Sequence, residues 1–192
     1  MSATAKKTHH AISDWIGDIV ALESHVEEAM DRQLKLKSES TDVSAALKRF
    51  HDAVRNSKQR AEAYQEQYGS EPGNPVKKVG ANLLGKAAGI IDMVRSDSVS
   101  KALRDDYAAY SLLAISYTML HTTSMALDDT ATSDFAGQGL KTYARLVQEI
   151  NNVLPEAVVQ DLKDHEDGLV IKPNVVQQCR TFIDKTWKQT AS

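Results

Sequence analysis

Two acidic residues stand where the hydrophobic pattern of the chain predicts buried helix faces. Glu23 lies near the centre of an apolar stripe that includes Ile16, Ile19 and Val26. Asp106 falls in register with the apolar residues of a later helix. A carboxylate inside an apolar core is costly unless it accepts hydrogen bonds, pairs with a cation or binds a metal ion. The role of these two carboxylates is therefore the main question that the sequence poses.

The first interpretation is a metal site. A di-iron site in a helical bundle takes one Glu from each of two helices and a Glu-x-x-His pair from each of the other two. The sequence contains no Glu-x-x-His or Asp-x-x-His. His121 follows Asp106 by 15 residues, about 22 Å along a helix, so the two cannot share one ion. We therefore expect no catalytic residue and no metal site, with Glu23 and Asp106 as weak candidate ligands.

The second interpretation is a buried hydrogen bond. Three tyrosines fall on predicted buried faces, and their hydroxyl groups can donate hydrogen bonds to a carboxylate. They are Tyr110, Tyr117 and Tyr143. In this interpretation Glu23 and Asp106 contribute to the core of the protein rather than to chemistry. A position near the end of the bundle is the remaining option for either residue.

Two further motifs carry weaker indications. The segment from Gly80 to Ala87 nearly matches a phosphate-binding loop, but its context is helical and Ala87 replaces the hydroxyl that holds magnesium. Its glycines are better explained by close packing of a connector helix. His25 sits about 120° from the centre of the apolar stripe, so we expect it to face water rather than to bind haem.

Helical periodicity recurs along the chain and strand-like alternation is absent, which predicts an all-α protein. The helix over 99–127 is apolar on more than one side, and this predicts a place in the middle of a bundle. The last helix is expected to bury Val175, Cys179, Phe182 and Ile183. The predicted helices cover residues 13–36, 41–69, 76–94, 99–127 and 133–154, followed by a short helix from 155 and a last helix from 174.

Composition narrows the class of protein. The 192 residues suit one domain, divided into a loose tail over 1–10, a bundle over 11–160 and a helical extension over 161–192. The net charge of −3 argues against nucleic acid as the main partner. No apolar run is long enough for a membrane span. The single cysteine, Cys179, excludes an intrachain disulfide. A cytoplasmic location is the resulting expectation.

The order of these elements resembles the ferritin-like domain of bacterial stress-induced proteins of the YciE and YciF type. The resemblance covers roughly residues 12–160 and implies a ferritin-like four-helix bundle with a glycine-rich connector helix. Metal-binding members of this family carry carboxylates and histidines on all four helices, whereas here only Glu23 is a credible ligand by position. The resembling segments are Val20–Glu23, Phe50–Gly69, Gly80–Gly89, Asp105–Tyr107, Ile115–Leu120 and Leu140–Leu154. Ala53, Asn56, Tyr110 and Leu113 stand where the second and third helices would offer ligands.

The resulting expectation is a ferritin-like structural, stress-related or binding protein without a complete di-iron site, a cofactor or catalytic activity. The apolar face of the last helix predicts a homodimer. One alternative is a metal-dependent oxidoreductase or iron-handling protein that uses iron or another divalent metal at a reduced site around Glu23 and Asp106. The other is a helical binder of haem or another apolar ligand.

Overall fold

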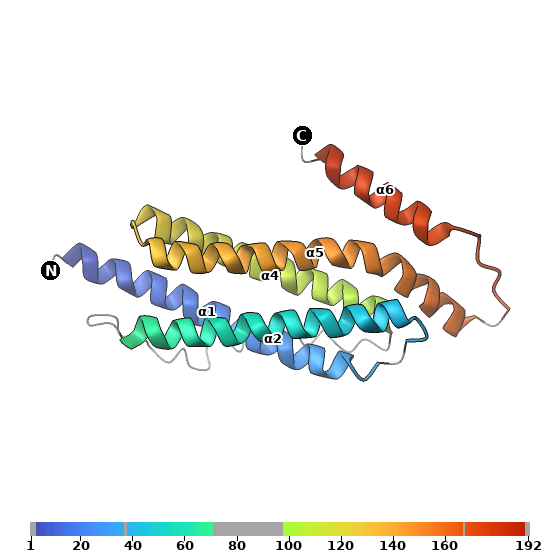
Figure 1. Cartoon of the computed structure of the whole chain (residues 1–192), viewed down its shortest axis with the longest axis horizontal. Coiled ribbons are helices and arrows are strands. Elements are labelled where there is room, and N and C mark those ends of the chain that lie inside the picture. Colours follow the sequence, from blue (N-terminus) through green and yellow to red (C-terminus); the bar gives the residue numbers. More distant parts are fainter. Residues whose placement is uncertain (1–2, 37, 71–97, 167, 191–192) are drawn as a thin grey trace.

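The computed structural model describes residues 3–36, 38–70, 98–166 and 168–190, and these residues form helices and connections without any strand. The all-α prediction is therefore confirmed. The helices α1, α2, α4 and α5 lie side by side in an elongated bundle, and α6 follows α5 after a reversal of chain direction (Figure 1). The bounds of the helices are α1 Ala3–Gln33, α2 Thr41–Ser70, α4 Val99–Ala126, α5 Thr130–His165 and α6 Val175–Thr190.

The core lies between the four long helices, with α1 packed on α2 and α4, and α5 packed on α4 and α2. The apolar stripe predicted for α1 is buried as expected, because its residues recur at helical spacing on one face. The helix α1 begins at Ala3 and α5 ends at His165, whereas the sequence predicted a bundle over residues 11–160. None of the helices in the described residues is long and apolar enough to cross a membrane.

The helix α5 is continuous, whereas the sequence predicted a break at Leu154 and a new helix from Pro155. It runs from Thr130 to His165 with Pro155 inside it. Proline removes one helical hydrogen bond and bends the helix, and the later part of α5 curves in Figure 1. Ala157 remains buried just after the proline, so core packing outweighs the local preference to stop. The helix also begins earlier than the predicted start at residue 133, because Asp129 caps it by accepting a hydrogen bond from the backbone amide of Thr132.

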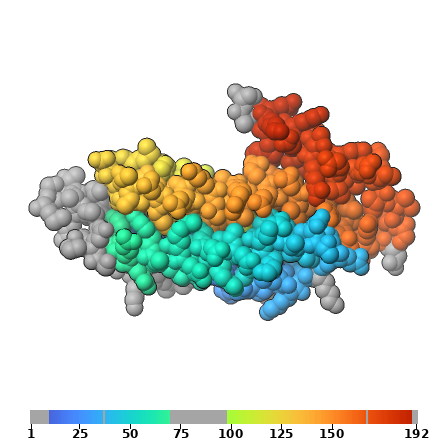
Figure 2. All heavy atoms as spheres, viewed as in Figure 1, coloured from blue at the N-terminus to red at the C-terminus, as the bar shows by residue number. Residues whose placement is uncertain are grey.

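The helix α6 does not bury the face that the sequence predicted. Cys179 is exposed, and Phe182 is 72% exposed, while Val175 and Ile183 are half-buried. The space-filling view shows α6 rising from the surface of the bundle (Figure 2). Arg180 fastens α6 to α5, since it donates to the carbonyl oxygen of Asn152 at 2.6 Å and to a Glu156 carboxylate oxygen at 2.9 Å. The helix α6 is amphipathic as predicted, but the four-helix bundle covers only part of its apolar face.

The helix α4 is covered on fewer sides than its sequence predicted. Its inner face is buried, with Tyr110, Leu113, Tyr117 and Leu120 fully enclosed. Its outer face exposes an apolar row, although the sequence indicated a helix in the middle of the bundle. The exposed fractions are 36% for Leu112, 58% for Ile115, 40% for Met119 and 64% for Met125.

The closest approach between α4 and α5 depends on Gly139. A Cβ atom at this position would lie 2.2–2.4 Å from three ring carbons of Tyr117. We therefore expect Gly139→Ala to lower the free energy of unfolding by about 1–3 kcal/mol, because the core is already filled. Urea denaturation followed by circular dichroism measures this change.

Gly137→Ala is the matched control two residues earlier. A Cβ atom there meets the His121 ring at 3.7 and 3.8 Å, an ordinary contact. Alanine also favours the helix over glycine by about 0.5–1 kcal/mol, so this variant should be as stable as the wild type or more so. Equal stability of the two variants would show that Gly139 does not set the spacing of α4 and α5.

Candidate functional site

The most unusual group in the core is the carboxylate of Glu23, which is fully buried. Its Oε1 atom accepts three hydrogen bonds, from Ser57 Oγ at 2.7 Å, Tyr143 OH at 2.8 Å and Tyr117 OH at 2.9 Å. These donors lie on α2, α5 and α4, and Glu23 itself lies on α1. Every long helix of the bundle therefore contributes one side chain to a single carboxylate oxygen.

The electrostatics of this cluster are dominated by burial. Removal from water raises the pKa of Glu23 above its usual range, and the three hydroxyl donors and the nearby charge of Arg60 reduce this rise. Arg60 donates a hydrogen bond to Ser57 Oγ at 3.1 Å and so contacts Glu23 indirectly, through Ser57. Burial, reinforced by the Glu23 carboxylate, also raises the pKa of Tyr117 and Tyr143. Both phenols consequently remain neutral donors.

Aromatic rings extend away from Glu23 in both directions. The Tyr117 and Tyr143 rings are stacked, with centroids 5.8 Å apart. Tyr143 lies 6.0 Å from Tyr110, and Tyr117 lies 5.9 Å from Phe135. Phe135 in turn stacks on Tyr64 at 4.1 Å, nearly parallel to it. The carboxylate therefore sits in the middle of a row of aromatic side chains that runs along the bundle.

Asp106 occupies a second buried polar position, at a different level. Its Oδ1 atom accepts from Gln33 Nε2 at 2.8 Å. Burial, with a smaller effect of the neighbouring Asp105 charge, raises the pKa of Asp106 to about 7. Asp106 Oδ2 and Gln33 Oε1 are both buried without a hydrogen-bond partner. A protonated Asp106 would suit Gln33 better than an ionised one. Its O–H group could donate a hydrogen bond to the amide oxygen of Gln33, which a carboxylate cannot do.

The two predicted acidic residues are buried, but the fold does not bring them together. Gln33, the partner of Asp106, follows Glu23 by ten residues on α1, which is about 15 Å along the helix. No group of three or more His, Cys, Asp or Glu side chains among the described residues could hold a metal ion. Hydroxyl donors reach Glu23 Oε1 and an amide donor reaches Asp106 Oδ1, and such donors suit an anion rather than a cation, while Glu23 Oε2 and Asp106 Oδ2 are buried without a hydrogen-bond partner. The donor set therefore does not fit a di-iron centre.

Several site residues differ from the sequence prediction. Ser57 and Gln33, the partners that complete the two sites, were not predicted, because neither residue type marks a buried position. His51 on α2, which the sequence did not single out as a site residue, is buried, with Nε2 lying 2.8 Å from Asp31 Oδ1. His25 was expected to face water and is half-buried. The loop-like segment from Gly80 to Ala87 lies outside the described residues.

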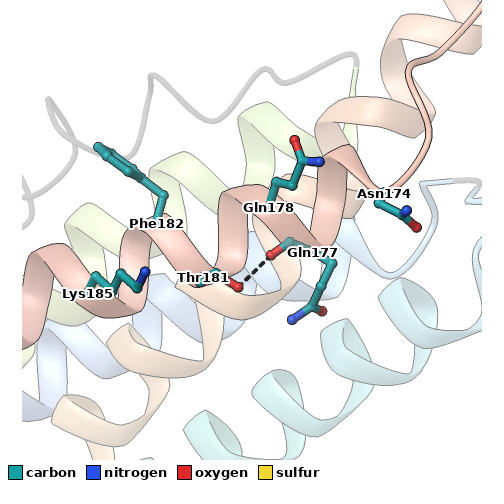
Figure 3. A pocket seen from close by; sticks show the side chains of 6 residues that line it. All are labelled: Asn174, Gln177, Gln178, Thr181, Phe182 and Lys185. Atoms are coloured by element: carbon teal, nitrogen blue, oxygen red, sulfur yellow. Dashed lines mark hydrogen bonds between the residues drawn. The ribbon is translucent and has the colours of Figure 1, made fainter.

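A surface hollow on α6 is a separate feature. Phe182, Lys185 and amide side chains of the same helix line it, and Figure 3 shows Phe182 directed away from the helix axis. Thr181 donates to the carbonyl oxygen of Gln177 within the helix at 2.9 Å (Figure 3). The described residues that line the hollow include no acid or histidine, and Lys185 is the titratable group among them.

The comparisons with known proteins agree on the fold. A family model described as a domain of unknown function, DUF892, matches residues 7–163. A solved structure of a protein from Xanthomonas campestris pv. campestris is similar, with a TM-score of 0.66 and 13% sequence identity. The match covers 82% of this chain and 98% of the Xanthomonas chain. None of the curated proteins matches the sequence significantly.

The first prediction for this site concerns Glu23. Glu23→Leu and Glu23→Ala should each lower the free energy of unfolding by about 3 kcal/mol or more, because both leave three buried hydroxyl groups without an acceptor. Glu28→Ala is the matched control on the same helix, since its exposed pair with Arg32 contributes at most about 1 kcal/mol. Urea denaturation measures all three variants. A more stable Glu23→Leu protein would contradict the hydrogen-bonded arrangement.

The second prediction concerns the pH dependence of stability. The pKa of Asp106 is about 7 in the folded protein and near 3.8 without burial, so the folded state binds more protons between these values. Stability should therefore fall as the pH rises from about 4 to about 7. Asp106→Asn removes this titration, so its stability relative to the wild type should increase over the same interval. Parallel stability curves for the two proteins would show that Asp106 is ionised throughout.

Proposed function

The chain belongs to the DUF892 family, whose fold is ferritin-like, and we propose that it is a structural or binding protein of the YciE and YciF type. It acts in the cytoplasm, in a stress-related role, without a di-iron centre and without catalytic turnover. The proposal rests on Glu23, whose carboxylate is buried in the bundle core and accepts hydrogen bonds from side chains of all three other long helices.

The hydrogen bonds of Glu23 support a structural role for this residue. A metal ion needs lone pairs directed at it, whereas Ser57, Tyr117 and Tyr143 direct hydroxyl hydrogens at Oε1. A di-iron centre here would require further carboxylates to enter the core, since among the described residues no group of three or more acidic, histidine or cysteine side chains is placed to hold a metal ion. Without such carboxylates, the four positive charges of two divalent ions would face one carboxylate in a dry environment, which is unfavourable.

The outer face of α4 supports association with another protein surface. The helix carries no Asp, Glu, Lys or Arg from Tyr107 to Leu127, about 30 Å of helix. Six serine and threonine hydroxyl groups in this stretch donate to carbonyl oxygens of their own helix, so they do not need water. These hydrogen bonds start from Ser111, Ser116, Thr118, Thr122, Thr123 and Ser124.

An uncharged face of this kind is self-complementary, and we assign it to a homodimer in which two copies of α4 pack across a two-fold axis. This assignment replaces the last helix as the expected contact, because α4 exposes the apolar side chains of Leu112, Ile115, Met119 and Met125, whereas α6 exposes those of Phe182 and Trp187. Light scattering should give twice the mass of the 21.1 kDa chain, and Ile115→Asp should give a monomer. A monomeric wild type at micromolar concentration would contradict the assignment.

Iron loading tests the absence of a di-iron centre. Anaerobic addition of Fe(II), followed by oxygen, should leave fewer than two bound irons per chain and no absorption of an oxo-bridged pair. The metal-free protein should unfold at the same temperature with and without prior chelation, since packing alone holds the helices. Two tightly bound irons per chain would favour the alternative of an iron-handling protein, and a visible band with added haem would favour a haem binder.

A further inference from the structure

A continuous row of aromatic rings passes through the core and past Glu23. Each ring lies within 6.3 Å of the next, measured between centroids. Five of the six tyrosines of the chain belong to the row. In spatial order the rings are Phe50, Tyr110, Tyr143, Tyr117, Phe135, Tyr64 and Tyr68. Ring contacts this close allow an electron to move between neighbouring side chains.

The two middle tyrosines are arranged for loss of an electron together with a proton. A phenol that is oxidised by one electron becomes strongly acidic, so its oxidation is easy only where a base accepts the proton. Tyr143 and Tyr117 both donate to Glu23 Oε1, at 2.8 and 2.9 Å. These distances are suitable for direct proton transfer.

Tyr64 has its own path for a proton and lies closer to the surface. Its hydroxyl lies 2.8 Å from Thr132 Oγ1, and Thr132 donates its single hydroxyl hydrogen to Asp129 Oδ2 at 2.7 Å. Tyr64 must therefore be the donor in its hydrogen bond with Thr132. Tyr64 and Asp129 are both half-buried, so this end of the row is within reach of an oxidant in solution.

We propose that the aromatic row is a one-electron reservoir, in which Tyr64 passes electrons outward and the Tyr117 and Tyr143 pair at Glu23 holds the resulting radical. A one-electron oxidant of high potential takes an electron from Tyr64, whose proton shifts through Thr132 towards Asp129. An electron from Tyr143 then moves to the oxidised Tyr64 by way of Tyr117 and Phe135. The proton that had shifted towards Asp129 moves back to the Tyr64 oxygen. The O–H bond of Tyr143 breaks and a new O–H bond forms at Glu23 Oε1.

The net reaction is balanced by the external oxidant. The oxidant gains one electron, Tyr143 becomes a neutral phenoxyl radical, and Glu23 becomes a neutral carboxylic acid. The radical is then surrounded by buried side chains, which protect it from solvent and from other reductants. The reservoir is stoichiometric and needs no metal, so it goes beyond the proposed structural role and does not depend on the dimer.

Photogenerated tris(bipyridine)ruthenium(III) is a suitable oxidant for a test on the metal-free protein. Freeze-quench electron paramagnetic resonance should detect a long-lived tyrosyl radical, identified by its change in line shape when the protein carries ring-deuterated tyrosine. Glu23→Gln keeps an oxygen acceptor but removes the base, so the rate of radical formation on the buried pair should fall about a hundredfold.

Tyr64→Phe keeps the ring stack on Phe135 but removes the oxidisable phenol, so the long-lived signal should be lost. This variant also tests the proposal if Glu23→Gln does not fold. Tyr107→Phe is the matched control, because Tyr107 is half-buried and its ring is not one of the seven that form the row. The signal of this variant should equal that of the wild type. A radical that persists in Tyr64→Phe, disappears in Tyr107→Phe or resides on tryptophan would overturn the proposal.

Discussion

A single carboxylate oxygen determines how the four long helices are placed relative to one another. Glu23 Oε1 is reached from α2, α4 and α5 at once, at distances between 2.7 and 2.9 Å. An unpaired anion in this position would cost several kcal/mol, so the registers of three helices are fixed by the need to supply donors. The close contact of α4 and α5 at Gly139 follows, because the Tyr117 ring that donates to the carboxylate occupies the space that a Cβ atom at Gly139 would need.

The same hydrogen bonds distinguish the core of this protein from the metal-binding cores of other four-helix bundles. The ferritin-like arrangement creates a space between four helices where other proteins place metal ligands. Here the hydroxyl groups of Ser57, Tyr117 and Tyr143 occupy that space, and each donates a hydrogen bond to the Glu23 carboxylate. A fold defines where a site can be, but side chains decide what the site does. Asp106, at another level of the bundle, is likewise matched to an amide and not to a cation.

Periodicity was sufficient to place Glu23 and Asp106 on buried faces and to identify Tyr117 and Tyr143 as hydrogen-bond donors, because a helical stripe fixes which side chains share a face. Ser57 was not predictable in this way, since it stands between Asn56 and Lys58 and adds no hydrophobic signal. The pattern also could not show how many neighbours a helix has. For that reason α6 was expected to bury Phe182 and α4 was expected in the middle of the bundle, although both expose apolar side chains.

The burial of the tyrosines has a consequence for the optical behaviour of the protein in alkali. Burial raises the pKa of Tyr110, Tyr117 and Tyr143 well above the usual value near 10. These phenols cannot ionise inside the bundle, so their phenolate absorption emerges only when the helices separate. Ultraviolet absorption in alkali thus acts as an internal indicator of opening, with a gradual contribution from accessible tyrosines followed by an abrupt one from the core.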